Sequence, residues 1–178
     1  MPTDDVERLK GLGVKGQGEI RRWLREKQPD RGSGRAFWWE SLATRALHEV
    51  YHAGNDEDRR AYASVVKAVT DEAVEVTVLS PVDGAIRIAK LAAVLGEQGR
   101  GLFDANEVVK ECLSYIGVPF DVAATQASDW RALPLPGILA LRRAKNLISA
   151  SSPLRDRVTD AGLLADLTRW AALRDQLP

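Results

Sequence analysis

The chain has 178 residues, of which 45% are hydrophobic and 28% are charged, and its 25 basic and 25 acidic side chains cancel. This balance is typical of a globular protein with its own core, and it excludes a disordered chain and a protein drawn to nucleic acid by net charge alone. The single cysteine, Cys112, excludes an intrachain disulfide and a multi-cysteine zinc site. Its helical spacing from Val109 and Ile116 predicts a buried structural thiol.

The first residues predict two short helices joined by glycines. Asp4 and Glu7 have the spacing of a capping box, so a helix is expected from Asp4 to about Lys10. Glycine-rich residues 11–18 predict a turn, and hydrophobic spacing predicts a second helix at about 17–27.

A proline- and glycine-rich run at residues 29–35 is typical of a linker. It divides the chain into two expected parts. Residues 1–35 are predicted to form a small basic helical arm, and residues 36–178 are predicted to form a helical bundle domain.

The rest of the chain is predicted to form a succession of helices. Apolar spacing and capping residues predict helices at about 36–53, from 56 onward, 81–95, 104–117, 137–150 and 160–176, with another start at Ser152-Pro153. Residues 74–79 alternate with period two, which fits a short strand or the end of a helix, and residues 118–136 are expected to be irregular. The predicted fold class is all-α: an irregular bundle of about seven or eight helices with at most one short strand near 74–79.

The motif with the clearest chemical meaning is His48-Glu49-Val50-Tyr51-His52, which contains the only histidines of the chain. On a helix, the two imidazoles lie one turn apart and can reach one metal ion, while Glu49 can act as a general base on metal-bound water. The helical wheel places both histidines opposite the apolar stripe that includes Trp39 and Val50. That position fits a metal site in a cleft, and it fits a solvent-exposed pair equally well.

The motif resembles that of the zincin peptidases. This resemblance implies that His48 and His52 are zinc ligands and that Glu49 activates water. In the gluzincin branch the third ligand is a glutamate one helix later, which implies Glu72, with Asp71 and Glu75 as its neighbours. Two features depart from the family. The spacing to Glu72 is one residue longer than usual, and residues 1–35 contain no strand to form the family's substrate-binding sheet edge.

A second motif is the segment Leu9-Lys10-Gly11-Leu12-Gly13, followed by Lys15 and a helix that contains Ile20. It resembles the helix-hairpin-helix motif, which implies that the glycine turn presents backbone N–H groups to a DNA phosphate. The residues implicated in nucleic-acid contact are Lys10, Gly11, Gly13, Lys15, Arg21 and Arg22. A mobile glycine hinge is the alternative interpretation.

The aromatic run Phe37-Trp38-Trp39 cannot face inward as a whole, because successive helical residues point about 100° apart. At least one of these rings is expected to meet the N-terminal arm or a partner.

These observations favour a non-catalytic helical interaction or regulatory protein with a protein partner and with nucleic acid as a further candidate partner. The alternative is a small zinc-dependent hydrolase that uses His48, Glu49, His52 and Glu72. No cofactor is expected unless that alternative holds, in which case the cofactor is zinc. No apolar run approaches the ~20 residues of a membrane span, and the first residues lack a signal-peptide pattern, so a cytoplasmic location is expected.

Overall fold

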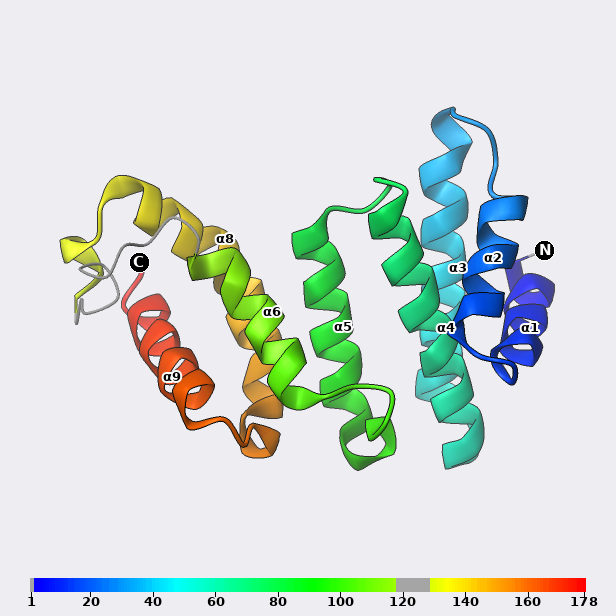
Figure 1. Ribbon diagram of the computed structural model, residues 1–178. Helices are drawn as coiled ribbons and strands as arrows, with labels where there is room; N and C mark the ends of the chain where they lie inside the picture. Colours follow the sequence, from blue (N-terminus) through cyan, green and yellow to red (C-terminus); the bar gives the residue numbers. More distant parts are fainter. Residues whose placement is uncertain (1, 118–128) are drawn as a thin grey trace. The chain divides into compact units, whose positions relative to one another are not determined.

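The computed structural model describes residues 2–117 and 129–178, and within these ranges every regular element is a helix (Figure 1). The predicted all-α fold class is therefore confirmed. The α-helices are α1 (Pro2–Gly13), α2 (Gln17–Lys27), α3 (Ser33–His52), α4 (Asp56–Glu75), α5 (Pro81–Leu95), α6 (Ala105–Gly117), α8 (Leu135–Ser151) and α9 (Ala161–Asp175). Three short 3-10 helices are η1 (Gly96–Gly99), η2 (Trp130–Ala132) and η3 (Ser152–Arg157).

The alternating run at 74–79 is the end of a helix followed by a turn, not a strand. Most of the segment expected to be irregular, residues 118–128, lies outside the described residues. The described part of that segment contains η2, and the helix after it begins at Leu135, slightly earlier than expected.

The chain forms two compact units, an N-terminal unit (Met1–Gly84) and a C-terminal unit (Ala85–Pro178). This division differs from the boundary at residue 35 that the linker sequence suggested. Helix α1 packs against α3 and α4, and α2 packs against α1 and α4, so residues 1–35 belong to the N-terminal unit (Figure 1). Leu9, Ile20 and Leu24 are fully buried there. Burial of these side chains attaches the first two helices to the unit.

The N-terminal unit is built around the hairpin of α3 and α4, which pack along each other (Figure 1). Asn55 ends the connection between them and caps α4, because its side chain accepts a hydrogen bond of 2.8 Å from the backbone N–H of Asp58. The acidic first turn of α4 adds a favourable interaction with the helix dipole. The apolar stripe of α4 is buried through Val65, Val66 and Val69. Because the connection is short, the two helices run antiparallel.

The C-terminal unit has a core between α6, α8, α9 and η3. Two of its helices, α6 and α9, start where the sequence predicted. The Asp104 side chain accepts from the N–H of Glu107 at 3.0 Å, and the Asp160 side chain accepts from the N–H of Leu163 at 2.9 Å. Cys112 is buried in this unit, as its helical spacing predicted. Burial raises the pKa of its thiol to about 12, so the thiol is neutral at physiological pH.

Candidate functional site

The two histidines lie in the last turn of α3, and both are exposed, which confirms their predicted position opposite the buried stripe. Their rings stack with centroids 4.1 Å apart and planes inclined by 17°. Nδ1 of His52 lies 2.8 Å from the backbone carbonyl oxygen of His48. A carbonyl oxygen can only accept, so Nδ1 of His52 carries the proton. The α-helical spacing of the motif therefore brings the two rings together.

Glu49 lies beside this pair but is engaged by a neighbouring cation. Its Oε1 atom is 2.5 Å from Nη2 of Arg45, one turn earlier on α3, and 3.7 Å from Nδ1 of His48. The expected catalytic base is thus held in a surface ion pair beside the ring of His48.

Glu72 is buried against α2, where two arginines hold its carboxylate. Nε of Arg21 donates to Glu72 Oε2 at 2.7 Å, and Arg25 donates to both carboxylate oxygens. Burial alone raises the pKa of Glu72, but the hydrogen bonds from Arg25 and Arg21 outweigh burial and lower it overall. Glu72 is therefore an ionised internal partner of α2, and both its oxygens are occupied.

The predicted third zinc ligand is therefore wrong. In the antiparallel hairpin, Glu72 lies about 24 Å along α4 from the end at which α3 finishes, at 1.5 Å per residue. Its neighbour Asp71 accepts a hydrogen bond of 2.7 Å from Nζ of Lys67. Within residues 2–117 and 129–178, no group of three His, Cys, Asp or Glu side chains could hold a metal ion. The histidines come together, but the expected third ligand does not join them.

The glycine segment adopts a different structure from the predicted turn. Helix α1 continues through Gly11 to Gly13, and the turn to α2 is formed by residues 14–16. Gly16 has a φ of 118°, a backbone conformation that glycine adopts without strain. The N–H groups of Lys15 and Gly16 donate to carbonyl oxygens of Leu12 and Gly13, each at 3.0 Å. These two N–H groups are thus already used, and the turn departs from a phosphate-binding glycine loop.

The basic side chains near this turn are mostly paired within the protein. Nζ of Lys10 donates to Asp58 at 2.7 Å, which raises the pKa of Lys10. Arg21 is held by Glu72, and Arg22 pairs with Glu19 on the surface of α2 at 2.6 Å. Of the predicted nucleic-acid contacts, Lys10 and Arg21 are thus paired with carboxylates of α4. Lys15 is exposed at the turn.

The three aromatic side chains at the start of α3 lie in three different environments. Trp39 is buried, and Trp38 stacks on Trp23 of α2 with centroids 6.4 Å apart. The expectation that one ring meets the N-terminal helices is confirmed by this stack. Phe37 faces outward and is 75% exposed.

Two large rings emerge on the outer face of α3, which we define by Phe37, Ser41, Thr44, His48 and Tyr51. Tyr51 is 57% exposed, and its position follows that of Phe37 by two heptads. A depression of about 460 Å³ lies on this face, and its lining comes entirely from α3: Phe37, Glu40, Ser41, Thr44, Arg45 and His48. Tyr51 was not among the predicted site residues, although the heptad spacing of Phe37, Thr44 and Tyr51 was an available signal.

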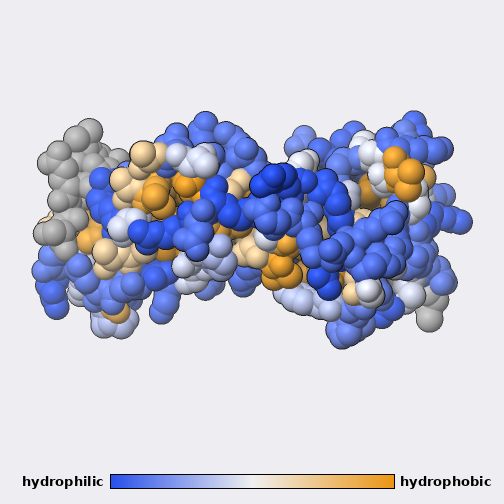
Figure 2. All heavy atoms as spheres, turned by 90° about the horizontal axis from the view of Figure 1, so that it is seen from below, coloured by the Kyte–Doolittle hydropathy of each residue, from blue (hydrophilic) through white to orange (hydrophobic). Residues whose placement is uncertain are grey.

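Exposed aromatic rings contrast with the general surface. The face seen in Figure 2 is mainly hydrophilic, and its apolar residues gather in a few separate patches. Large exposed apolar side chains within the described ranges are Val14, Phe37, Tyr51, Val94, Leu135 and Leu139. Phe37 and Tyr51 are the aromatic members of this set, and one helix face carries both.

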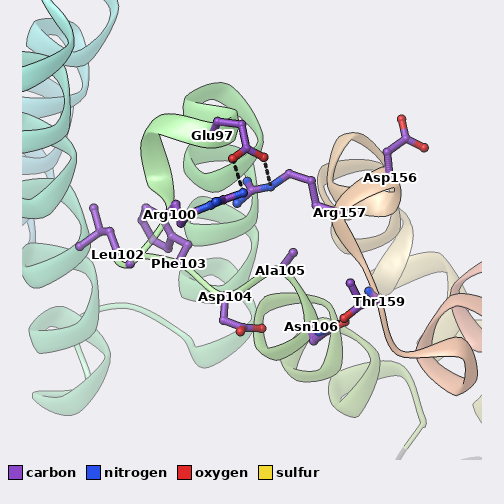
Figure 3. A pocket seen from close by; sticks show the side chains of 11 residues that line it. Glu97, Arg100, Leu102, Phe103, Asp104, Ala105, Asn106, Asp156, Arg157 and Thr159 are labelled. Atoms are coloured by element: carbon purple, nitrogen blue, oxygen red, sulfur yellow. Dashed lines mark hydrogen bonds and ion pairs between the residues drawn. The ribbon is translucent and has the colours of Figure 1, made fainter.

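A larger and more polar cavity of about 640 Å³ lies in the C-terminal unit, between the segment from η1 to α6 and the end of η3 (Figure 3). Glu97 lies between two arginines in its wall, 2.7 Å from Arg100 and 3.8 Å from Arg157. Asn106 joins the two sides, because its side chain donates to Oγ1 of Thr159 at 2.8 Å and accepts from the N–H of Thr159 at 3.0 Å. Both arginines of this wall thus face the Glu97 carboxylate. No motif in the sequence indicated it.

No family model matches the sequence, and neither the curated proteins nor the solved structures contain a significant match. Among the helices of the described residues, none is both long and apolar enough to cross a bilayer. Inference about function therefore rests on the geometry of the sites themselves.

Proposed function

We propose that this chain is a non-catalytic helical interaction protein and that the outer face of α3 is its binding surface. The observation that carries the proposal is the pair of exposed rings, Phe37 and Tyr51, on one face of a twenty-residue helix. Exposed aromatic side chains are enriched where proteins bind one another, because they bury a large area at a small cost in side-chain entropy.

The spacing along this face suits a helical partner. Phe37, Thr44 and Tyr51 recur every seven residues, the repeat at which one helix contacts another along a seam. Ser41 and Thr44 between the rings are small, so a partner helix can approach the backbone of α3 closely. The rings would then enclose the two ends of the contact, with small polar side chains at its centre.

The partner that fits this pattern is a second copy of the chain. Phe37 and Tyr51 lie seven residues before and after Thr44, so a two-fold axis at Thr44 pairs Phe37 of one copy with Tyr51 of the other. Such self-complementarity is what an isologous dimer requires. The depression beside Phe37 is then placed to receive the Tyr51 ring. The two α3 helices would run antiparallel.

Self-association of the full chain tests this proposal by analytical ultracentrifugation over a range of concentrations. Phe37→Glu and Tyr51→Glu place a charge in the seam, and each is expected to raise the dimer dissociation constant by about tenfold or more. Val14→Glu is the matched control, because Val14 is 89% exposed in the turn between α1 and α2 and should leave the constant unchanged.

A crosslink tests the proposed register. In a Cys112→Ala background, Thr44→Cys should form an intermolecular disulfide on oxidation, because the two-fold axis brings both copies of position 44 together. Lys15→Cys, in the exposed turn, is the control that should not. A chain that stays monomeric at every concentration would exclude a second copy as the partner. A dimer unaffected by the Phe37 and Tyr51 variants would exclude this face.

A further inference from the structure

We propose that His48 and His52 form an open two-ligand site for a late transition-metal ion such as Zn²⁺, Ni²⁺ or Cu²⁺. This site is distinct from the predicted zincin centre, because it uses neither Glu72 nor a catalytic base. Both ligands come from one turn of one helix, so a single copy of the chain supplies them and the site does not require the dimer, although His48 also lies on the outer face of α3. Imidazole nitrogen is a preferred donor for these ions.

The hydrogen bond of His52 fixes which nitrogen can bind. Its Nδ1 atom donates to the carbonyl oxygen of His48 at 2.8 Å, so Nδ1 holds the proton. The neutral ring then has its lone pair on Nε2, which is the atom left to face a metal ion. Metal-binding histidines in proteins characteristically donate their other ring N–H to a backbone carbonyl or a carboxylate.

The environment of His48 favours the same tautomer. Glu49 places Oε1 at 3.7 Å from Nδ1 of His48, and the negative charge favours the proton on that nitrogen. Arg45 holds this carboxylate in position by its 2.5 Å ion pair. In the tautomer favoured by this charge, Nε2 of His48 is also the atom with the free lone pair. Glu49 acts here as a positioning residue, because it favours the proton on one nitrogen of the His48 ring.

The two rings are already side by side before any ion binds. Their centroids are 4.1 Å apart and their planes differ by 17°, so chelation requires rotation of the stacked rings about their side-chain torsions but no movement of the helix backbone. The His48 side chain is half exposed, which leaves the remaining coordination positions to water or to a donor from another molecule. A site with two protein ligands keeps open coordination positions, unlike a structural site closed by four.

Calorimetric titration of the full chain with ZnCl₂ and with CuCl₂ tests the site, and one ion per chain is expected. His48→Ala and His52→Ala should each lower the affinity by about tenfold or more, and the double variant should be little weaker than either single one, because each loss already removes the chelate. The same titration is also made on Phe37→Glu, which should weaken the proposed dimer. Metal binding can then be interpreted whether or not the chain dimerises.

A rearranged variant separates the pair from the mere presence of two histidines. In His52→Ala/Ala53→His, the second imidazole is about 140° around the helix from the first, so it cannot share the ion. Affinity equal to that of His52→Ala alone is expected. Affinity equal to the wild type in this variant, or in both single variants, would overturn the proposal and leave adventitious surface binding.

The tautomers provide an independent test without metal. Nitrogen-15 NMR of the metal-free chain should show the proton on Nδ1 of His52, and Glu49→Gln should reduce the Nδ1–H population of His48. The same Glu49 variant should weaken metal binding while the exposed pair remains intact. Protons on Nε2 of both rings would contradict the assignment.

Discussion

The two units bury polar groups in different ways, and the difference shows where the chain depends on distant contacts. In the N-terminal unit, the buried carboxylate of Glu72 is bonded to Arg21 and Arg25, which are about fifty residues earlier in the chain. In the C-terminal unit, the buried hydroxyl of Ser151 donates to carbonyl oxygens of Leu147 and Ile148 in its own helix. The hydrogen bonds of Glu72 connect α2 to α4, whereas those of Ser151 stay within its own helix.

Removal of these groups should therefore have unequal costs. Glu72→Ala leaves two arginines without their partner at the α2–α4 contact, and we expect it to lower the free energy of unfolding by about 2 kcal/mol. Arg21 and Arg25 can be partly hydrated at the surface, so the cost stays below that of a fully buried pair. Urea denaturation followed by circular dichroism measures the loss.

Ser151→Ala is the matched control in the C-terminal unit, and its expected cost is below about 0.5 kcal/mol, because the carbonyl partners keep their helical hydrogen bonds. Residue-resolved hydrogen exchange assigns each effect to its unit. If the two variants lose the same free energy of unfolding, the distinction between long-range and local hydrogen bonding of buried groups would be contradicted.

The same comparison explains what the sequence could predict. The helix starts capped by Asn55, Asp104 and Asp160 were predictable, because a cap depends on residues three positions apart. The pairing of Glu72 with Arg21 and Arg25 was not, because local sequence does not specify which of many opposite charges will meet. The metal prediction failed for the same reason. It assigned Glu72 to the site of the histidines, whereas in the folded hairpin Glu72 lies against α2.

The glycine segment and the outer face of α3 show two further limits. The run from Gly11 to Gly18 predicted a turn, yet tertiary packing of α1 extends the helix to Gly13 and overrides the low helix propensity of glycine. The relative positions of Phe37 and Tyr51 were predictable from helical periodicity. Their exposure could not be predicted in this way, because it depends on which faces of α3 the other helices cover in the folded chain.

The C-terminal unit should be the more sensitive of the two at alkaline pH through Cys112. Burial raises the pKa of this thiol to about 12, whereas an unfolded thiol ionises near its ordinary value of about 8.5. The stabilising contribution is fully present below the unfolded pKa and is lost as pH rises towards the folded pKa. From pH ~8 to pH ~10 the expected loss is about 2 kcal/mol, measured by urea denaturation at each pH.

Cys112→Ala removes this contribution and is the control, because it retains Tyr115, whose pKa is also raised by burial. The variant should lose less stability over the same pH range than the wild type. A Cys112 thiol that reacts with a disulfide reagent in the folded chain as fast as in urea would show that the site is not closed to solvent.

The N-terminal unit should show the opposite dependence, at acid pH and with the smallest effect. The arginines lower the pKa of Glu72 despite its burial, so the ionised bridge stabilises the fold above the ordinary pKa of a carboxyl group and is lost as pH falls through the lowered value. From about pH 6 to about pH 3, the wild type should lose more stability than Glu72→Gln, which has no charge to titrate.

The size of this acid effect is limited by water around the bridge. The Arg25 side chain is 57% exposed, so solvent screens part of its attraction to Glu72, and added salt should weaken the effect further. Asp58, whose pKa Lys10 lowers by hydrogen bonding, is retained in both proteins, so the difference between them isolates Glu72. Hydrogen exchange at acid pH should then show α4 amides losing protection in the wild type relative to Glu72→Gln. Equal pH profiles for the two proteins would mean that geometry, and not charge, holds α2 on α4.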